Sequence, residues 1–250
     1  MEIYRTKFKG EIISEFSVPA KKSNKVMILC SGMPSVPKKQ DVMEFFAKRG
    51  YWVFLPRYRG SWESEGVMFK YSPTKDIRDI ISELPKGFKE FWGNKNFKIG
   101  NPKVYLIGSS FGGPAALLNS KLKEVKKVIC FSPVIDWQDQ KNTTESIERL
   151  APFLKKAFGR AYVIAKDGWK KIKQGKLYNP STETEKVDGS KCLIFHAKDD
   201  DIVLWKPLKP FIGKTGAKLM LAKIGGHLGM AILEKRFYKK CMQFLAGRSR

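Results

Sequence analysis

The chain has 250 residues and a mass of 28.6 kDa, which suits one large domain or one domain with an insertion. Hydrophobic residues make up 42 % of it, too many for a disordered chain, and no apolar run approaches the ~20 residues that a membrane span needs. Lysine and arginine number 48 against 24 acidic residues, a formal net charge of +24. Because the lysines are scattered along the chain, we expect no nucleic-acid partner and at most a weak peripheral contact with membranes.

The cysteines and histidines indicate the cellular compartment and limit the metal sites that the chain can form. Cys30, Cys130, Cys192 and Cys241 lie in apolar or helix-like runs and form no C-x-x-C pair. They are interpreted as reduced, buried thiols of a cytoplasmic protein. With only two histidines in the chain, we expect no zinc site built from cysteine and histidine, and no metal or other cofactor.

Apolar runs that end in turn residues alternate with segments of helical period. In chain order we expect a hairpin (2–18), a strand (25–32), a helix (41–50), a strand (51–60), a helix broken or ended near Pro85 (74–93), a strand (103–110), a helix (111–122), a strand (126–133), a strand with its loop (191–201), a proline-broken helix (203–213), a strand (217–226) and a closing helix (230–247). This alternation predicts an α/β fold with a mostly parallel central sheet flanked by helices.

One region interrupts the alternation. Residues 136–190 carry helical patterns without a clear strand, and they are far longer than an ordinary crossover between strands. We interpret them as a helical cap inserted into a core formed by 1–135 and 191–250, with 178–181 marking the return to the core.

The run "VYLIGSSFGGPAALL" contains a G-x-S-x-G pattern between a predicted strand and a predicted helix. In a nucleophile elbow such glycines allow a sharp turn that exposes the central serine above the sheet edge. Ser110 takes the central position between Gly108 and Gly112. The alternative is a packing turn with an inert serine. If Ser110 is the nucleophile, the backbone N–H of Phe111, the next residue, is an expected oxyanion donor.

A serine nucleophile needs a base, and the chain offers His196 and His227. His196 lies within a predicted strand, which favours a core histidine with a satisfied hydrogen bond. His227 follows two glycines after a predicted strand, and loops at the carboxyl ends of strands carry the functional groups of α/β sheets. We therefore expect His227 to be the base.

The acid that orients the base is expected between the serine and the histidine in chain order. Asp199, Asp200 and Asp201 are adjacent there, and their mutual repulsion argues against a purely stabilising role. Asp201 could alternatively cap the following helix.

The serine turn, the acidic loop and the Gly-Gly-His loop together resemble the α/β-hydrolase superfamily, from about Lys25 to the C-terminus. Within this span, "PRYRGSWESEG" (56–66) is similar to a loop of serine esterases and of prolyl-oligopeptidase-like and dienelactone-hydrolase-like members. We interpret Arg57, Arg59 and Ser64 as residues that tie this loop by its own hydrogen bonds. The sequence departs from the usual pattern at Ser31, where histidine is frequent, and at Ala197, where glycine is usual.

The resemblance implies roles for further residues. The loop pattern Gly-x-x-Asp-x-x-Val of many relatives selects Asp200 as the acid, while some relatives place it where this chain has Asp136. The loop after the first buried strand implies the Met33 N–H as the second oxyanion donor. The implied activity is hydrolysis of a small-molecule carboxylic ester through a Ser110–His227–Asp200 triad and an acyl-enzyme.

Two other functions remain open. The first is a lipid- or thioester-directed, or peptidase-like, hydrolase that docks on anionic surfaces, since 141–176 holds ten Lys or Arg against three Asp or Glu. The second is a non-catalytic binding protein on the same scaffold. Apolar residues of the predicted cap either line an acyl pocket or attach the cap to the sheet; they are Phe153, Leu154, Phe158, Tyr162 and Trp169.

Overall fold

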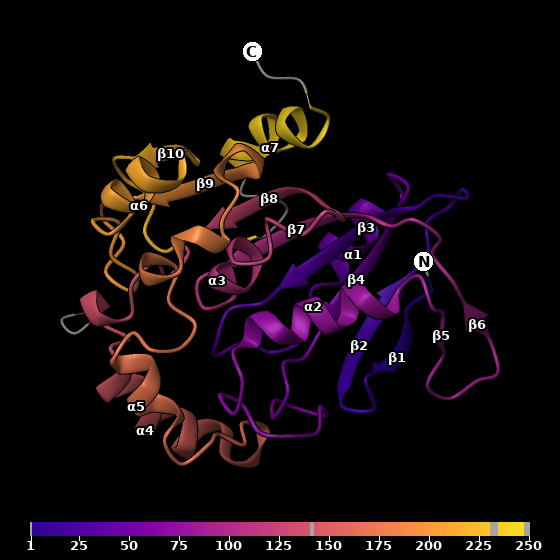
Figure 1. Cartoon of the computed structure of the whole chain (residues 1–250), viewed down its shortest axis with the longest axis horizontal. Coiled ribbons are helices and arrows are strands. Elements are labelled where there is room, and N and C mark those ends of the chain that lie inside the picture. The colour runs from indigo at the N-terminus through magenta and orange to yellow at the C-terminus, as the bar shows by residue number, and fades with distance from the viewer. Residues whose placement is uncertain (1, 141–142, 231–234, 248–250) are drawn as a thin grey trace.

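The central feature of the fold is an eight-stranded sheet in a computed structural model that describes residues 2–140, 143–230 and 235–247 (Figure 1). Its strands are β1 (Tyr4–Phe8), β2 (Ile12–Ser17), β3 (Lys25–Cys30), β4 (Tyr51–Pro56), β7 (Lys103–Ser109), β8 (Val125–Phe131), β9 (Cys192–Ala197) and β10 (Lys218–Ala222). The order across the sheet is β1-β2-β4-β3-β7-β8-β9-β10. β1 and β2 pair antiparallel, β2 joins β4 antiparallel, and β4 through β10 are parallel. The α/β-hydrolase fold expected from the sequence is therefore present.

Helices cover both faces of this sheet. They are α1 (Gln40–Ala47), α2 (Pro73–Glu83), α3 (Gly112–Leu117), α4 (Ile147–Phe158), α5 (Gly168–Lys173), α6 (Leu208–Thr215) and α7 (Tyr238–Leu245). One face packs against α1 and α7, and the other against α2, α3 and α6. The parallel strands are buried on both sides as a result, which explains why β3 and β7 read as continuous apolar runs rather than alternating ones.

One predicted helix ends near its proline, as expected, and a second is only partly described. The helix predicted over 74–93 ends at Glu83, just before Pro85, and the chain continues into a small hairpin of β5 (Phe88–Lys89) and β6 (Asn96–Phe97). Its aromatic side chains do not follow a helical period because they fill the space beside β1 and β2. The closing helix predicted over 230–247 is described only from its 3₁₀ start at Lys235, and 231–234 lie outside the described residues.

The segment between β8 and β9 is helical in its described part. It contains α4, α5 and several 3₁₀ turns, and in Figure 1 both helices lie at the edge of the molecule, away from the sheet. Isolated β-bridges join it to the loop after β4, between Tyr162 and Ser61 and between Ile164 and Met68. The described residues include no helix long and apolar enough to cross a membrane. All four cysteines are free and buried.

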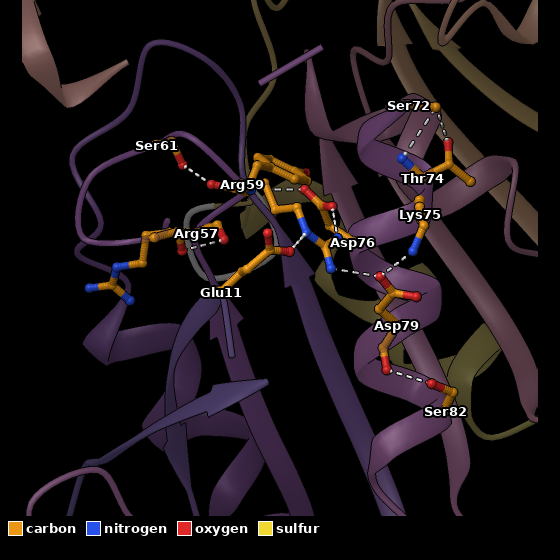
Figure 2. Close-up of polar contacts among 12 residues, drawn as sticks. Glu11, Arg57, Arg59, Ser61, Ser72, Thr74, Lys75, Asp76, Asp79 and Ser82 are labelled. Carbon is orange, nitrogen blue, oxygen red and sulfur yellow. Dashed lines mark hydrogen bonds and ion pairs between the residues drawn. The ribbon is translucent and has the colours of Figure 1, made fainter. Parts of the chain in front are cut away.

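The loop after β4 is fixed by two buried arginines. Figure 2 shows Arg59 between Glu11, in the turn before β2, and the two aspartates Asp76 and Asp79 of α2. Burial raises the pKa of Asp76 to about 6, although the Arg59 charge and its hydrogen bonds act in the opposite direction. The arginine thus joins the β1–β2 turn to α2 through a pair that is largely removed from water.

Arg57 and Ser64 bind the same loop to β2. The Arg57 side chain is 2 % exposed and pairs with Glu15 at 2.8 Å. The Ser64 hydroxyl accepts the Ile13 N–H and donates to the Arg57 carbonyl. The interpretation of these residues as structural is confirmed, but most of their partners lie in β2, in the β1–β2 turn and in α2 rather than within the loop itself.

We expect Arg59→Met to lower the free energy of unfolding by about 3–5 kcal/mol at pH 8, because it leaves the Asp76 carboxylate buried without its cation. The loss should be smaller at pH 5. The pKa of Asp76 is higher in the folded protein than in the unfolded chain. Protonation of Asp76 therefore stabilises the fold at low pH, and this stabilisation is lost as the pH rises. Urea denaturation at both pH values measures this.

The control for this experiment is Lys75→Met, which removes a half-exposed partner of Asp79. It should change stability by no more than about 0.5 kcal/mol at either pH. A pH-independent loss in Arg59→Met would contradict the assignment of the cost to the Asp76 charge.

Candidate active site

Ser110 occupies a strained turn between β7 and α3. Its φ is +50°, in the left-handed region that residues with a Cβ seldom adopt. Three backbone hydrogen bonds fix the turn: the Ser110 N–H donates to Phe131 O at 3.0 Å, and its carbonyl accepts from Gly113 and Val134. Such strain persists only where the surrounding structure enforces it. The Ser110 hydroxyl has no hydrogen bond to any described residue, so it is free to interact with a ligand.

The glycines around Ser110 permit a close approach of α3 to the sheet. A Cβ on Gly112 would overlap the backbone carbonyl of Cys30, at the end of β3. A Cβ on Gly108 would lie 2.7 Å from Gly112 O. The loop after β3 also reaches Ser110, since a Cβ on Gly32 would lie 3.4 Å from the Ser110 Cβ. The 31–33 loop therefore lies beside the serine.

The first turn of α3 is held by a residue from the inserted segment. The Tyr178 hydroxyl donates to Phe111 O at 2.6 Å and accepts the Ala115 N–H at 3.1 Å. It thereby contacts both the N-cap carbonyl and an amide of the first helical turn. The Phe111 ring packs against the Tyr178 ring, with centroids 5.1 Å apart. Sequence reasoning used 178–181 only as a boundary and missed this contact, which no local pattern indicates.

His227 and Asp200 form a directly bonded pair. The Asp200 side chain is fully buried after β9, and His227 Nδ1 lies 3.0 and 3.1 Å from its two oxygens. Oδ1 also accepts the N–H groups of Ile202 and Val203, both at 3.0 Å. Burial alone would raise the pKa of Asp200. The hydrogen bond and charge of His227, together with the Val203 N–H, outweigh this and hold the pKa below its usual value. An ionised Asp200 fixes the proton of neutral His227 on Nδ1 and leaves Nε2 as the basic atom.

The neighbouring aspartates have different partners. Asp199 accepts the N–H groups of Gly225 and Gly226, each at 2.9 Å, and so holds the loop that precedes His227. Asp201 accepts a hydrogen bond from the Thr144 hydroxyl at 2.8 Å. The alternative that Asp201 caps the following helix is wrong, because α6 begins only at Leu208 and follows Pro207.

Asp136, the alternative acid, is engaged elsewhere. Its carboxylate accepts hydrogen bonds from the Ser181 hydroxyl at 2.8 Å, from the Gln138 N–H and from the Asn179 amide. These contacts join the two ends of the inserted segment. The structure therefore brings Asp200, and not Asp136, to His227. His196, the alternative base, is fully buried in β9 and has no access to a substrate.

A small, open pocket lies beside Ser110. Its lining combines the core with α4 of the inserted segment: Met33, Ser110, Phe111, Val134, Trp137, Gln140, Glu145, Leu150, Ile202 and Val203. The N–H groups of Met33 and Phe111 donate to no acceptor in the described part of the chain. Two backbone donors without partners are thus available close to the serine.

Glu145 is the acidic side chain of this pocket, and sequence reasoning did not single it out. It is half-buried, and within the described ranges no lysine or arginine forms an ion pair with it. Burial raises its pKa, and the negative charges of Asp200 and Asp201 act in the same direction, while His227 acts in the opposite one. Among the described residues, this carboxylate is therefore available to a cationic group of a ligand.

The apolar residues of the inserted segment attach it to the core. Trp169 packs on Phe69 with ring centroids 5.1 Å apart, and Phe158 and Tyr162 pack on Trp62. None of the five residues considered for an acyl pocket lines the space beside Ser110. Among the described side chains, no group of three or more His, Cys, Asp or Glu is arranged to hold a metal ion.

The fold and this arrangement define an α/β-hydrolase of the serine-hydrolase type. More narrowly, the chain belongs to the family described as serine aminopeptidase, S33, whose profile matches residues 21–191. No curated protein sequence matches it.

Solved structures with the same fold are similar over nearly the whole chain. An esterase of Pyrococcus furiosus superposes with a TM-score of 0.70 at 15 % identity, covering 98 % of this chain and 90 % of that one. A putative lipase of Acinetobacter baumannii gives 0.68 at 16 % identity over 99 % and 91 %. An acylaminoacyl peptidase of Pyrococcus horikoshii gives 0.66 at 17 % identity over 98 % of this chain but 41 % of the peptidase. At these identities the likeness concerns the fold alone.

The contact between α3 and β3 generates a test of the turn. Gly112→Ala should lower the free energy of unfolding by about 3 kcal/mol, because the added methyl meets backbone that cannot move aside. Gly213→Ala in α6 is the matched control, since a methyl there meets nothing within 4 Å. It should raise stability by about 0.5–1 kcal/mol. Urea denaturation measures the free energy of unfolding of both variants. Equal changes in the two variants would contradict the close approach of α3 to β3.

Proposed function

We propose that the protein hydrolyses carboxylic esters through an acyl-enzyme on Ser110, with His227 as the base and Asp200 as the residue that orients it. The observation that carries the proposal is the buried Asp200 carboxylate bonded to His227 Nδ1, on loops at the sheet edge where Ser110 also lies. The chain order Ser, Asp, His is that of α/β-hydrolases. The esterase and lipase among the similar structures agree with this chemistry.

The proposed reaction starts with proton transfer. His227 Nε2 removes the proton of the Ser110 hydroxyl as the oxygen attacks the ester carbonyl. Asp200 keeps the ring in the required tautomer and stabilises the imidazolium that forms. No hydrogen bond joins Ser110 to His227 in the ligand-free chain, and such bonds commonly tighten only when substrate binds.

Negative charge then develops on the carbonyl oxygen. The N–H groups of Phe111 and Met33, which have no other acceptor among the described residues, are the proposed donors to this oxyanion. Each such donor contributes about 2.7–4 kcal/mol of transition-state stabilisation. His227 next protonates the leaving alcohol, and water repeats the sequence on the acyl-enzyme. Every step uses groups of this chain and water.

The assignment is tested by labelling with a fluorophosphonate serine probe and by turnover of p-nitrophenyl butyrate. We expect wild-type protein to be labelled and Ser110→Ala to be unlabelled and inactive. Asp200→Asn should lower kcat about 10⁴-fold, because the wrong histidine tautomer is then favoured. Asp136→Asn is the matched control and should retain most of kcat, since Asp136 bonds only the inserted segment. Labelling of Ser110→Ala at the wild-type rate would refute the proposal.

A second candidate function is hydrolysis next to a free amino group, as the name of the family suggests. The specific observation in its favour is Glu145, a carboxylate that has no cationic partner among the described residues and lines the pocket that also contains Ser110. An α-ammonium group bound there would place the adjoining carbonyl toward the serine. The nucleophile, base and acid would be the same, and only the substrate would differ.

Glu145→Gln distinguishes the two functions. If the substrate is aminoacyl, the variant should raise KM for L-alanine p-nitroanilide roughly 10- to 100-fold, the equivalent of losing a charge-assisted hydrogen bond. KM for p-nitrophenyl butyrate should not change, because this ester has no cation. An unchanged KM for the anilide, or no turnover of it by wild-type protein, would leave ester hydrolysis as the function.

A further inference from the structure

Both histidines of the chain lie against the same carboxylate. His227 Nδ1 is 3.0 Å from Asp200 Oδ2, and His196 Nε2 is 3.9 Å from the same oxygen. His196 belongs to β9, four residues before Asp200, and both side chains are completely buried. The proposed reaction uses only His227. His196 is therefore a buried titratable group beside Asp200 that has no role in the proposed reaction.

The carboxylate of Asp200, rather than the backbone, distinguishes the two tautomers of His196. Burial lowers the pKa of the ring, so it carries a single proton at neutral pH. Nδ1 lies 3.0 Å from both the nitrogen and the oxygen of Ala197, so the backbone offers a partner to either tautomer. With the proton on Nε2, Nδ1 accepts the Ala197 N–H and the Nε2–H lies beside the Asp200 carboxylate. With the proton on Nδ1, that N–H donates to Ala197 O, but the Nε2 lone pair then lies beside the negative carboxylate.

The Nε2 atom is otherwise without a partner. It is fully buried and makes no hydrogen bond to the described residues, a condition that few buried polar atoms tolerate. Asp200 Oδ1 already has the amides of Ile202 and Val203, whereas Oδ2 faces the two imidazole rings. The unpartnered Nε2 atom and an oxygen that already accepts from His227 therefore lie 3.9 Å apart, a little beyond hydrogen-bond distance, and a carboxylate oxygen can accept a second donor.

We propose that His196 is a positioning residue that acts on the reaction through Asp200, its Nε2–H directed at Oδ2 so that the carboxylate stays ionised and aligned with His227. The inference rests on the proposed function. Glu145, Asp199 and Asp201 lie near this cluster and are all negative, so the Asp200 carboxylate depends on N–H donors such as those of the two imidazoles. Because His196 does not line the pocket, its removal should change kcat and leave KM unaltered.

The test compares His196→Met with His196→Gln, two unbranched side chains of similar length of which only glutamine carries an N–H donor. We expect His196→Met to lower kcat for p-nitrophenyl butyrate about 10-fold, equivalent to about 1.4 kcal/mol in the barrier, with KM unchanged. His196→Gln should recover most of the loss. Phe195→Leu, at a buried neighbour that stacks on Phe131, is the control for a general weakening of β9. It should lower thermal stability without lowering kcat.

A double-mutant cycle with Asp200→Asn shows whether His196 acts through the acid or only fills space. The rate of fluorophosphonate labelling of Ser110 is the readout, because slow labelling remains measurable. If His196 acts through Asp200, His196→Met should have little further effect in the Asp200→Asn background. Equal losses in both backgrounds, equal losses with methionine and glutamine, or no loss with methionine would each overturn the inference. Labelling of Ser110→Ala at the wild-type rate would instead refute the proposed function itself.

Discussion

The candidate site depends on how closely α3 approaches the carboxyl ends of β3 and β7. Without side chains at Gly108 and Gly112, the first turn of the helix rests on backbone carbonyls, and Ser110 is forced into the left-handed region above the sheet edge. That approach also brings the 31–33 loop beside the serine. Tyr178 fixes this contact from outside by bonding Phe111 and Ala115, and the Ser110 hydroxyl beside it has no hydrogen bond to the described residues.

Much of this could be predicted from the sequence because the signals are local. A buried parallel strand is a continuous apolar run, so β3, β7 and β9 were recognisable from a few residues each. The serine turn follows from glycine spacing, since only glycine allows backbone to touch backbone there. The scarcity of histidine indicated His227, chain order indicated the 199–201 loop, and the resemblance to α/β-hydrolases selected Asp200 within that loop.

The remaining features arise from contacts between distant residues. Phe88 lies within the predicted helix 74–93, but the structure places it in a hairpin with Phe97, where both rings pack on Phe16 of β2. Tyr178 caps a helix 63 residues before it, and Glu145 enters the pocket only because the inserted segment folds back over Ser110. Asp136 resembles a catalytic acid in sequence, but Ser181 and Asn179 occupy its carboxylate once the segment closes.

The net charge of +24 does not determine the electrostatics of the site. Exposed lysines act through water and salt, which screen them over about 8–10 Å, whereas buried groups act at close range in a poorly screened interior. Among the described residues that line the pocket beside Ser110, the charged one is Glu145, and the carboxylates of Asp200 and Asp201 lie close enough to act on it. If Ser110 is the nucleophile, as we propose, its substrate meets an acidic environment inside a basic protein. We therefore expect a neutral or cationic substrate group there, in contrast to the anionic preference that the composition of 141–176 suggests.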